Sequence, residues 1–288
     1  MLAALQSAPV ELSWWEAVIL GLVEGITEYL PVSSTGHLLA TNEFLGLNET
    51  AESTAAADTF AICIQVGAIL AVLVLYWSRI RQMLDGLFGR SEEGRKVLFA
   101  VIAAFIPTAI IGVFLRGFVK DRLFGLTPIT IAWLVGGLIV LALVRSKWFD
   151  RTGHELRDLT VQHAALIGVA QAVALWPGVS RSLVTIIAGV AVGMRLAAAV
   201  EFSFLLGLLT LTAATVLEGA DNGQAMLDTF GWVTPLIGLV VAFVSAAAAV
   251  RWMVDWLNKR GFAIFGWYRV AIGVLGLALI AANVLPGS

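Results

Sequence analysis

Six long apolar runs constrain this chain more than any other feature. A helix that crosses the roughly 30 Å hydrocarbon core of a bilayer needs about 20 mostly apolar residues. Runs of this kind lie at about residues 59–77, 97–115, 127–144, 198–217, 231–250 and 262–285. With 59% apolar and 13% charged residues in 288, the chain has too few polar side chains to cover a water-soluble surface. The sequence therefore predicts an all-α polytopic membrane protein, with residues 1–288 forming a single membrane domain.

The distribution of charge predicts how these runs are oriented. Short loops rich in Lys and Arg stay on the cytoplasmic side of a membrane. Most of the 18 basic residues lie near 79–96, 145–157 and 251–260, whereas residues 42–58 and 218–230 carry acidic side chains without Lys or Arg. We therefore expect the three basic segments in the cytoplasm. The two acidic segments and both chain termini are expected outside.

Two further apolar stretches are interrupted by proline. The path from the cytoplasm at residue 160 to the outside at residue 218 is completed by one crossing, so residues 161–195 must enter the membrane and return. Pro177-Gly178 breaks this stretch, and Pro31 breaks residues 13–45 in the same way. Proline lacks an amide hydrogen and clashes with the preceding turn, and irregular backbone at membrane depth requires a covering of protein or a water-filled cavity. Both breaks therefore predict a polar pocket.

The two interrupted stretches also resemble each other. Aligning residues 17–36 with 164–183 pairs Gly21 with Gly168, Glu24 with Gln171 and Tyr29 with Trp176 and, after a one-residue gap, Pro31 with Pro177 and Ser34 with Ser180. Each stretch is followed by three crossings, and an odd number makes the two halves run in opposite senses. The sequence predicts an inverted-topology repeat over 13–145 and 159–286, each half a broken re-entrant helix pair plus three transmembrane helices.

The first break concentrates chemistry in "EGITEYLPVSSTGH", residues 24–37. Glu24 and Glu28 are four residues apart and share a helix face, while Ser34 and His37 follow on the next helix. A polar helix contact is the structural interpretation of such residues. Two carboxylates at helical spacing favour function instead, because each costs roughly 2.5–3.5 kcal/mol at the membrane centre. Such a pair could hold a divalent cation or separate its pKa values so that one member serves as acid or base.

The second break carries "PGVSRS", residues 177–182. Arg181 lies at the start of a helix after Gly178, where free N–H groups and the helix dipole favour an anion. Its anionic partner is either Glu24 or Glu28 in a structural ion pair, or a ligand phosphate. Gln171, the repeat equivalent of Glu24, is expected to line the same cavity. Together the two breaks indicate phosphoryl transfer, and the membrane setting points to a lipid phosphate.

Both motifs resemble the signature motifs of the bacterial undecaprenyl-diphosphate phosphatase family of the bacitracin-resistance type. The likeness extends through "IQVGAILAVLVLYW" (64–77), "EFSFLLG" (201–207) and "WYR" (267–269). The resemblance implies an enzyme that removes the terminal phosphate from the C55 polyprenyl diphosphate carrier of cell-wall synthesis. It also implies dependence on a divalent cation, Mg²⁺ or Ca²⁺, an inverted-repeat fold, and an active site that opens to the outer (periplasmic) face of the bacterial plasma membrane.

The resemblance also assigns residues. The catalytic positions fall on Glu24, Glu28, Ser34, His37 and Arg181, and the substrate-binding neighbours are Ser33, Thr35, Ser180, Ser182 and Thr185. From the residue pattern itself we add Arg181, Gly178 and Gln171 to the substrate-binding residues and expect Glu24 and Glu28 to be the metal ligands. In the mechanism that we expect, Ser34 attacks the outer phosphorus and His37 acts as acid or base. Two other assignments stay open, with His37 as the nucleophile or with a directly activated water.

A transporter or flippase of a polyprenyl phosphate lipid is the alternative function, because broken helices in inverted repeats are also a transporter architecture. A carrier needs buried charge but has no use for a reacting Ser34. The expected partners are a long-chain polyprenyl diphosphate and the bilayer, without nucleic acid, and a homodimer is left open.

Overall fold

A computed structural model describes residues 12–47 and 51–286 of the chain. Over this range the secondary structure consists of α-helices and three short 3-10 helices. Six helices are long and apolar enough to cross a membrane: α3 (Ala51–Leu75), α5 (Glu92–Arg122), α6 (Leu126–Arg145), α9 (Leu196–Phe230), α10 (Val233–Arg260) and α11 (Ala263–Ala281). The prediction of an all-α polytopic membrane protein is confirmed. The predicted positions of both chain termini concern residues outside this description.

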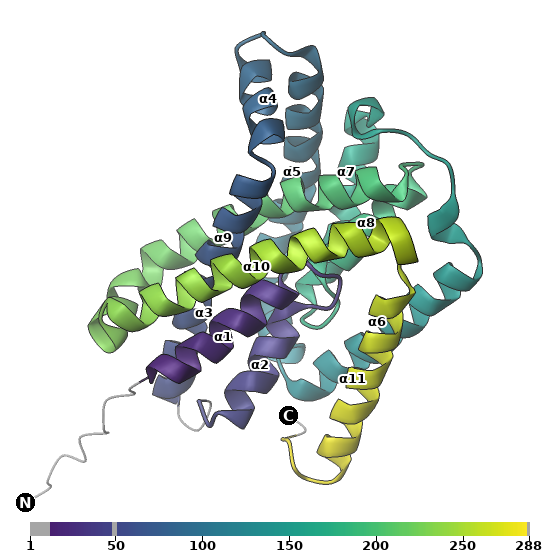
Figure 1. Ribbon diagram of the computed structural model, residues 1–288. Coiled ribbons are helices and arrows are strands. Elements are labelled where there is room, and N and C mark those ends of the chain that lie inside the picture. The colour runs from purple at the N-terminus through teal and green to yellow at the C-terminus, as the bar shows by residue number, and fades with distance from the viewer. Residues whose placement is uncertain (1–11, 48–50, 287–288) are drawn as a thin grey trace, which may run out of the picture.

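Several helices continue where the sequence indicated loops. α5 runs on to Arg122, α9 to Phe230 and α10 to Arg260. The basic segment 79–96, predicted as a loop, instead forms α4 (Trp77–Leu87) and the start of α5. Lys, Arg and Glu are good helix formers, so a helix does not have to end where its apolar run ends. Figure 1 shows α4 and the start of α5 projecting together at one end of the molecule.

Arg79 fastens α4 to the rest of the bundle. Its guanidinium lies 2.8 Å from the Glu93 carboxylate on α5 and 2.7 Å from the Glu201 carboxylate on α9. Burial by itself would lower the pKa of Arg79, but hydrogen bonds and charge from Glu201 and Glu93 outweigh it and raise that pKa. The guanidinium therefore stays charged, and one side chain joins three helices at this end.

Two helix-break-helix units lie among the long helices. α1 (Trp14–Thr27) and α2 (Ser34–Phe44) flank the first break, residues 28–33. α7 (Val161–Gln171), the 3-10 helix η3 (Ala172–Leu175) and α8 (Arg181–Ala191) flank the second break, residues 176–180. These helices have 11 to 14 residues, fewer than the roughly 20 that a crossing needs. Both breaks occur at the prolines where the sequence predicted them.

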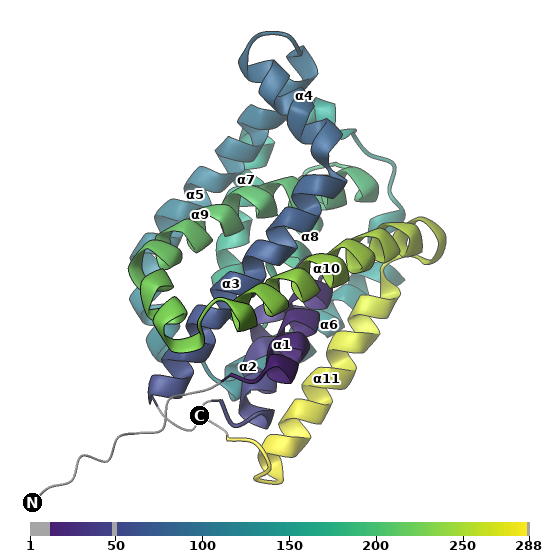
Figure 2. The same ribbon diagram turned by 60° about the vertical axis from the view of Figure 1, so that its left-hand side comes forward.

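The two units pack against long helices from the opposite half of the chain. α1 lies along α10, as Figures 1 and 2 both show, and α7 lies along α5. Glycine makes both contacts close, because a Cβ on Gly25 would lie 2.4 Å from the Ala242 carbonyl oxygen and a Cβ on Gly168 would lie 2.0 Å from the Ala104 carbonyl oxygen. Backbone-to-backbone contacts of this kind fix where each break sits in the bundle.

The α7–α5 contact gives a test of this packing. Gly168→Ala should lower the thermal stability of the detergent-purified protein, because its Cβ meets backbone that cannot move freely, and overpacking costs about 1–3 kcal/mol. Gly117→Ala on α5 is the matched control, since a Cβ there has open space around it. Equal melting temperatures for the two variants would contradict the close approach of α7 to α5.

Candidate active site

The first break places a carboxylate and a hydroxyl in contact. Glu28 follows the last residue of α1 and Ser34 is the first residue of α2. The Ser34 hydroxyl donates a hydrogen bond to Oε2 of Glu28, and both residues are buried. Between them Ser33 has φ of 75°, in the left-handed region that side chains other than glycine rarely occupy. This conformation lets the chain reverse within a few residues, so that Ser34 returns to the carboxylate.

The second break brings a guanidinium to the same carboxylate. Ser180, with φ of 77°, precedes α8, and Arg181 is the first residue of that helix. Arg181 donates to Oε1 of Glu28 at 3.1 Å and to the Ser203 carbonyl at 3.0 Å. Of the anionic partners that the sequence offered, the structure thus pairs Arg181 with Glu28. One carboxylate receives both Ser34 and Arg181, one from each break.

Hydrogen bonds between the breaks hold them together. The Gly178 N–H donates to the Ser33 hydroxyl at 3.1 Å, and the Ser182 hydroxyl donates to the Leu30 carbonyl at 2.9 Å. Ser180 caps α8 by accepting the Leu183 N–H at 3.3 Å. Polar backbone in a membrane protein must find partners inside the protein. Here some of these partners come from the other break and others from neighbouring turns of the same segment.

A cavity of about 180 Å³ opens beside these groups. Its lining includes Glu28, Ser33, Ser34, Thr35, Gln65, Trp176, Ser180 and Arg181. A second cavity, of about 460 Å³, shares Ser34, Thr35 and Gln65 with the first and continues to Glu24, Asn42, Asp58 and Glu218. We call the two together the active-site cavity. Several buried atoms in this region have no protein partner, among them Nε of Arg181 and Oε1 of Glu24, and such atoms indicate where a polar ligand can bind.

Four predicted substrate-binding residues lie away from the cavity lining: Gln171, Ser182, Thr185 and Gly178. Gln171 donates to the Thr108 hydroxyl at 2.9 Å and so packs against α5. The Thr185 hydroxyl lies 2.6 Å from that of Ser203. Ser182, tied to Leu30, also lies behind the lining. These residues line neither part of the active-site cavity, and Gly178 contacts the first break through its backbone N–H.

His37 also points away from the Ser34–Glu28 pair. Its Nδ1 lies 2.6 Å from the Ser33 carbonyl oxygen and its Nε2 lies 2.8 Å from the Tyr268 hydroxyl. The ring stacks on Tyr268 and touches Trp133, and it lines neither part of the active-site cavity. A spacing of three residues placed His37 near Ser34 along the helix but did not determine which neighbouring helix its ring would meet.

Gln65 and Trp176 line the cavity but were not predicted as site residues, and the same holds for Asn42, Asp58 and Glu218. Gln65 lines both parts of the cavity and Trp176 lines the smaller part. The signal for Gln65 was an amide within an otherwise apolar run. Trp176 lies directly before Pro177-Gly178, but an aromatic residue in a membrane segment does not distinguish a cavity wall from a lipid contact.

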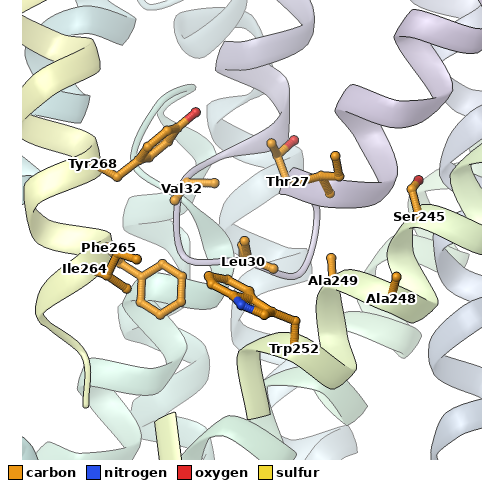
Figure 3. Close-up of a pocket in the computed structure, with 11 residues that line it drawn as sticks. Thr27, Leu30, Val32, Ser245, Ala248, Ala249, Trp252, Ile264, Phe265 and Tyr268 are labelled. Carbon is orange, nitrogen blue, oxygen red and sulfur yellow. The ribbon is translucent and has the colours of Figure 1, made fainter. Parts of the chain in front are cut away.

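A separate apolar groove, which shares no lining residue with the active-site cavity, lies beside the first break (Figure 3). Its volume is about 510 Å³, and it runs between α10, α11 and the first break, with Leu30, Val32, Trp252 and Phe265 among its walls. The Thr27 hydroxyl on its lining is already bonded to the Val23 carbonyl. The groove therefore suits hydrocarbon and not phosphate.

The carboxylates of the site are suited to a hard cation. Within the described residues no three His, Cys, Asp or Glu side chains gather into a cluster that could hold a metal by itself. Mg²⁺, however, is often held by one or two carboxylates together with water and substrate phosphates. Glu24, with its unpartnered oxygen, and Glu28 are such donors.

Known proteins match this chain over most of its length. The family model of the bacitracin resistance protein BacA matches residues 17–275, which include both breaks. An undecaprenyl-diphosphatase of Sorangium cellulosum is 41% identical over 269 residues, covering 92% of this chain and 86% of the relative. Undecaprenyl-diphosphatase 2 of Rhodospirillum rubrum is 40% identical over 268 residues, covering 91% and 93%. An undecaprenyl-diphosphatase of Cereibacter sphaeroides is 39% identical over 269 residues, covering 93% and 97%.

Gly207 provides a test of the Arg181 position. A Cβ at residue 207 would lie 2.0 Å from Nη1 of Arg181, so Gly207→Ala should displace the guanidinium from Glu28. We expect at least about tenfold weaker binding of inorganic diphosphate, measured by calorimetry, from the loss of charge-assisted hydrogen bonds. Gly219→Ala on the same helix has open space for its Cβ and is the control. Wild-type affinity in Gly207→Ala would exclude Arg181 as the anion-binding group.

Proposed function

Because the chain belongs to the bacitracin resistance protein BacA family, we propose that it acts as an undecaprenyl-diphosphatase of the bacterial inner membrane. It hydrolyses undecaprenyl diphosphate to undecaprenyl phosphate and phosphate, and so returns the lipid carrier to cell-wall synthesis. The observation that carries this proposal is the convergence of Ser34 and Arg181 on Glu28. A nucleophile (Ser34), a base (Glu28) and a phosphate-binding guanidinium (Arg181) then share one buried cavity, as phosphoryl transfer requires.

In the mechanism that we propose, Ser34 is the nucleophile and Glu28 is its base. Glu28 takes the Ser34 proton while Oγ bonds to the outer phosphorus, and the bond from that phosphorus to the bridging oxygen breaks. Undecaprenyl phosphate leaves, and water then hydrolyses the phosphoserine. Arg181 holds the transferring phosphoryl group with its planar donors. This scheme moves the acid-base role from His37, whose two ring nitrogens face Ser33 and Tyr268, to Glu28.

We further propose that a divalent cation, Mg²⁺ or Ca²⁺, is held by Glu24 and Glu28. Such a cation would neutralise phosphate charge as the phosphoryl group transfers. The buried, unpartnered oxygen of Glu24 supports this assignment. The amide oxygens of Asn42 and Gln65, which also line the cavity, could serve as additional neutral metal ligands.

The cavity is proposed to open to the outer face of the membrane. Its wide part reaches Asp58 and Glu218, which belong to the two acidic segments that the charge rule places outside. The basic residues of α4 and the start of α5 project at another end of the molecule (Figure 1). Phosphate would then be released on the outer (periplasmic) side of the membrane.

We also propose that residues 13–145 and 159–286 form an inverted repeat. Support comes from two equivalent contacts: α1 of the first half packs on α10 of the second half, and α7 of the second half packs on α5 of the first half. Ser33 and Ser180 have nearly equal φ values of 75° and 77°. Ser33 and Ser180 are separated by the same number of residues as Glu24 and Gln171, which favours an alignment of the two halves without the gap. This alignment pairs Ser34 with Arg181. The alternative function, a transporter or flippase, is not favoured, because the named relatives are diphosphatases.

Phosphate release from undecaprenyl diphosphate by detergent-purified protein tests the function. We expect release that depends on added Mg²⁺ or Ca²⁺ and that falls at least about 100-fold in Glu28→Ala and in Arg181→Ala, since removal of a group that stabilises charge in the transition state has effects of that order. Arg195→Ala is the control, because it removes an exposed ion pair with Glu155. No release by folded wild-type protein would refute the proposal and direct attention to lipid movement in liposomes.

A rapid-quench experiment tests the nucleophile. Labelled lipid diphosphate should leave a phosphoserine at Ser34, found by mass spectrometry after digestion, and Ser34→Ala should abolish both label and turnover. Label on His37 would transfer the role to that residue. Near-normal turnover by Ser34→Ala without any covalent label would show that activated water attacks directly.

A further inference from the structure

Arg269 on α11 is a buried cation whose bonds all go to neutral groups. Its exposed fraction is 0%. Its guanidinium donates to the carbonyl oxygens of Pro31 at 3.3 Å, Ala132 at 2.9 Å and Gly178 at 2.8 Å. No carboxylate within the described part of the chain forms an ion pair with it. A charge at membrane depth is expensive, and where one is kept without a counter-ion its hydrogen bonds must serve a purpose.

The three acceptors show what Arg269 joins. Pro31 belongs to the first break, Gly178 to the second break, and Ala132 to α6. A planar guanidinium spreads five N–H donors over three nitrogens and can reach acceptors from well-separated segments, whereas the three donors of a lysine ammonium share one nitrogen and cover a shorter span. One side chain therefore sets the spacing between the two breaks and fixes both against α6 and α11.

Tyr268, the preceding residue on α11, holds the first break by a second route. Since a carbonyl oxygen only accepts, Nδ1 of His37 donates to the Ser33 carbonyl, and in the neutral ring Nε2 then accepts the proton of the Tyr268 hydroxyl. Tyr268 lies where the apolar groove meets α11 (Figure 3). We call Tyr268 and Arg269 the α11 clamp.

The segments that the clamp holds are the strained ones. Ser33 and Ser180 are in the left-handed region and Gly178 has φ of 92°. Such conformations cost about 1–3 kcal/mol each for residues other than glycine, and they persist only where surrounding contacts fix them. Each serine directly precedes a reacting residue, Ser34 or Arg181. By holding the carbonyls of Pro31 and Gly178, Arg269 therefore fixes the backbone positions from which the Ser34 and Arg181 side chains extend.

We propose that Arg269 is a positioning residue for phosphoryl transfer and sets the distance between Ser34 and Arg181 from a helix that does not reach the substrate. This inference rests on the proposed function and extends it to α11. Arg269 lines no part of the active-site cavity, so its effect reaches the reaction through the two breaks. Displacing it should impair the chemical step more than the binding of lipid.

Gly136 on α6 allows Arg269 to be displaced without being removed. A Cβ at residue 136 would lie 2.4 Å from Nη2 and 3.0 Å from Cζ of Arg269. Gly136→Ala and Arg269→Lys should each lower kcat about 100-fold, because small misplacements of reacting groups have effects of this size. KM should stay within about threefold. Gly117→Ala, with open space for its Cβ, and Arg251→Lys, at an exposed position, are the controls.

The experiment measures kcat and KM for undecaprenyl diphosphate on protein that elutes as a single folded species. Added guanidinium ion should restore part of the turnover of Arg269→Ala, which a purely structural role would not produce. Unchanged kcat in folded Gly136→Ala would overturn the proposal, and this variant decides the matter if the Arg269 variants do not fold. Wild-type protein that releases no phosphate would overturn the proposed function instead.

Discussion

Irregular backbone inside a membrane must have its polar groups satisfied by protein, and the rest of this structure depends on how that requirement is met at the two breaks. The Gly178 N–H bonds to Ser33, the Leu30 carbonyl accepts from Ser182, and the carbonyls of Pro31 and Gly178 accept from Arg269. Each break is thus stabilised in part by the other and in part by Arg269. The requirement that keeps the fold intact also brings Ser34, Glu28 and Arg181 to one point.

The pairing of Glu28 with Arg181 has a consequence for catalysis. Their side chains are only 6% and 13% exposed, so the ion pair is poorly screened by water. Breaking a buried pair by removing one partner leaves an uncompensated charge, which is costly. A diphosphate brings its own negative charge to Arg181, and it can therefore weaken the hold of Arg181 on Glu28 without leaving the guanidinium unpaired. The substrate itself would then free Glu28 to accept the Ser34 proton.

Sequence reasoning predicted most of the fold because hydrocarbon imposes simple rules. Six spans and two proline breaks followed from run length and from the missing N–H of Pro31 and Pro177. Helix ends such as Arg122 and Arg260 did not, since a charged helical turn is stable beyond the membrane. Glu28, Ser34 and Arg181 were predicted as site residues, whereas Gln171 and His37 turned to α5 and α11. Spacing determines the face of a helix, but only tertiary packing determines what that face meets.

The two breaks have similar backbone conformations but carry different chemical groups. Ser33 and Ser180 share their φ values, yet the next residue is a hydroxyl in one case and a guanidinium in the other. Likewise Glu24 corresponds to the neutral Gln171, and Glu28 to Leu175, under the same offset. Two carboxylates in both halves would bury four like charges, and an arginine in both would replace Ser34, the nucleophile. Division of the charges gives a cation for the phosphate and a carboxylate for the nucleophile while the buried ion pair remains neutral.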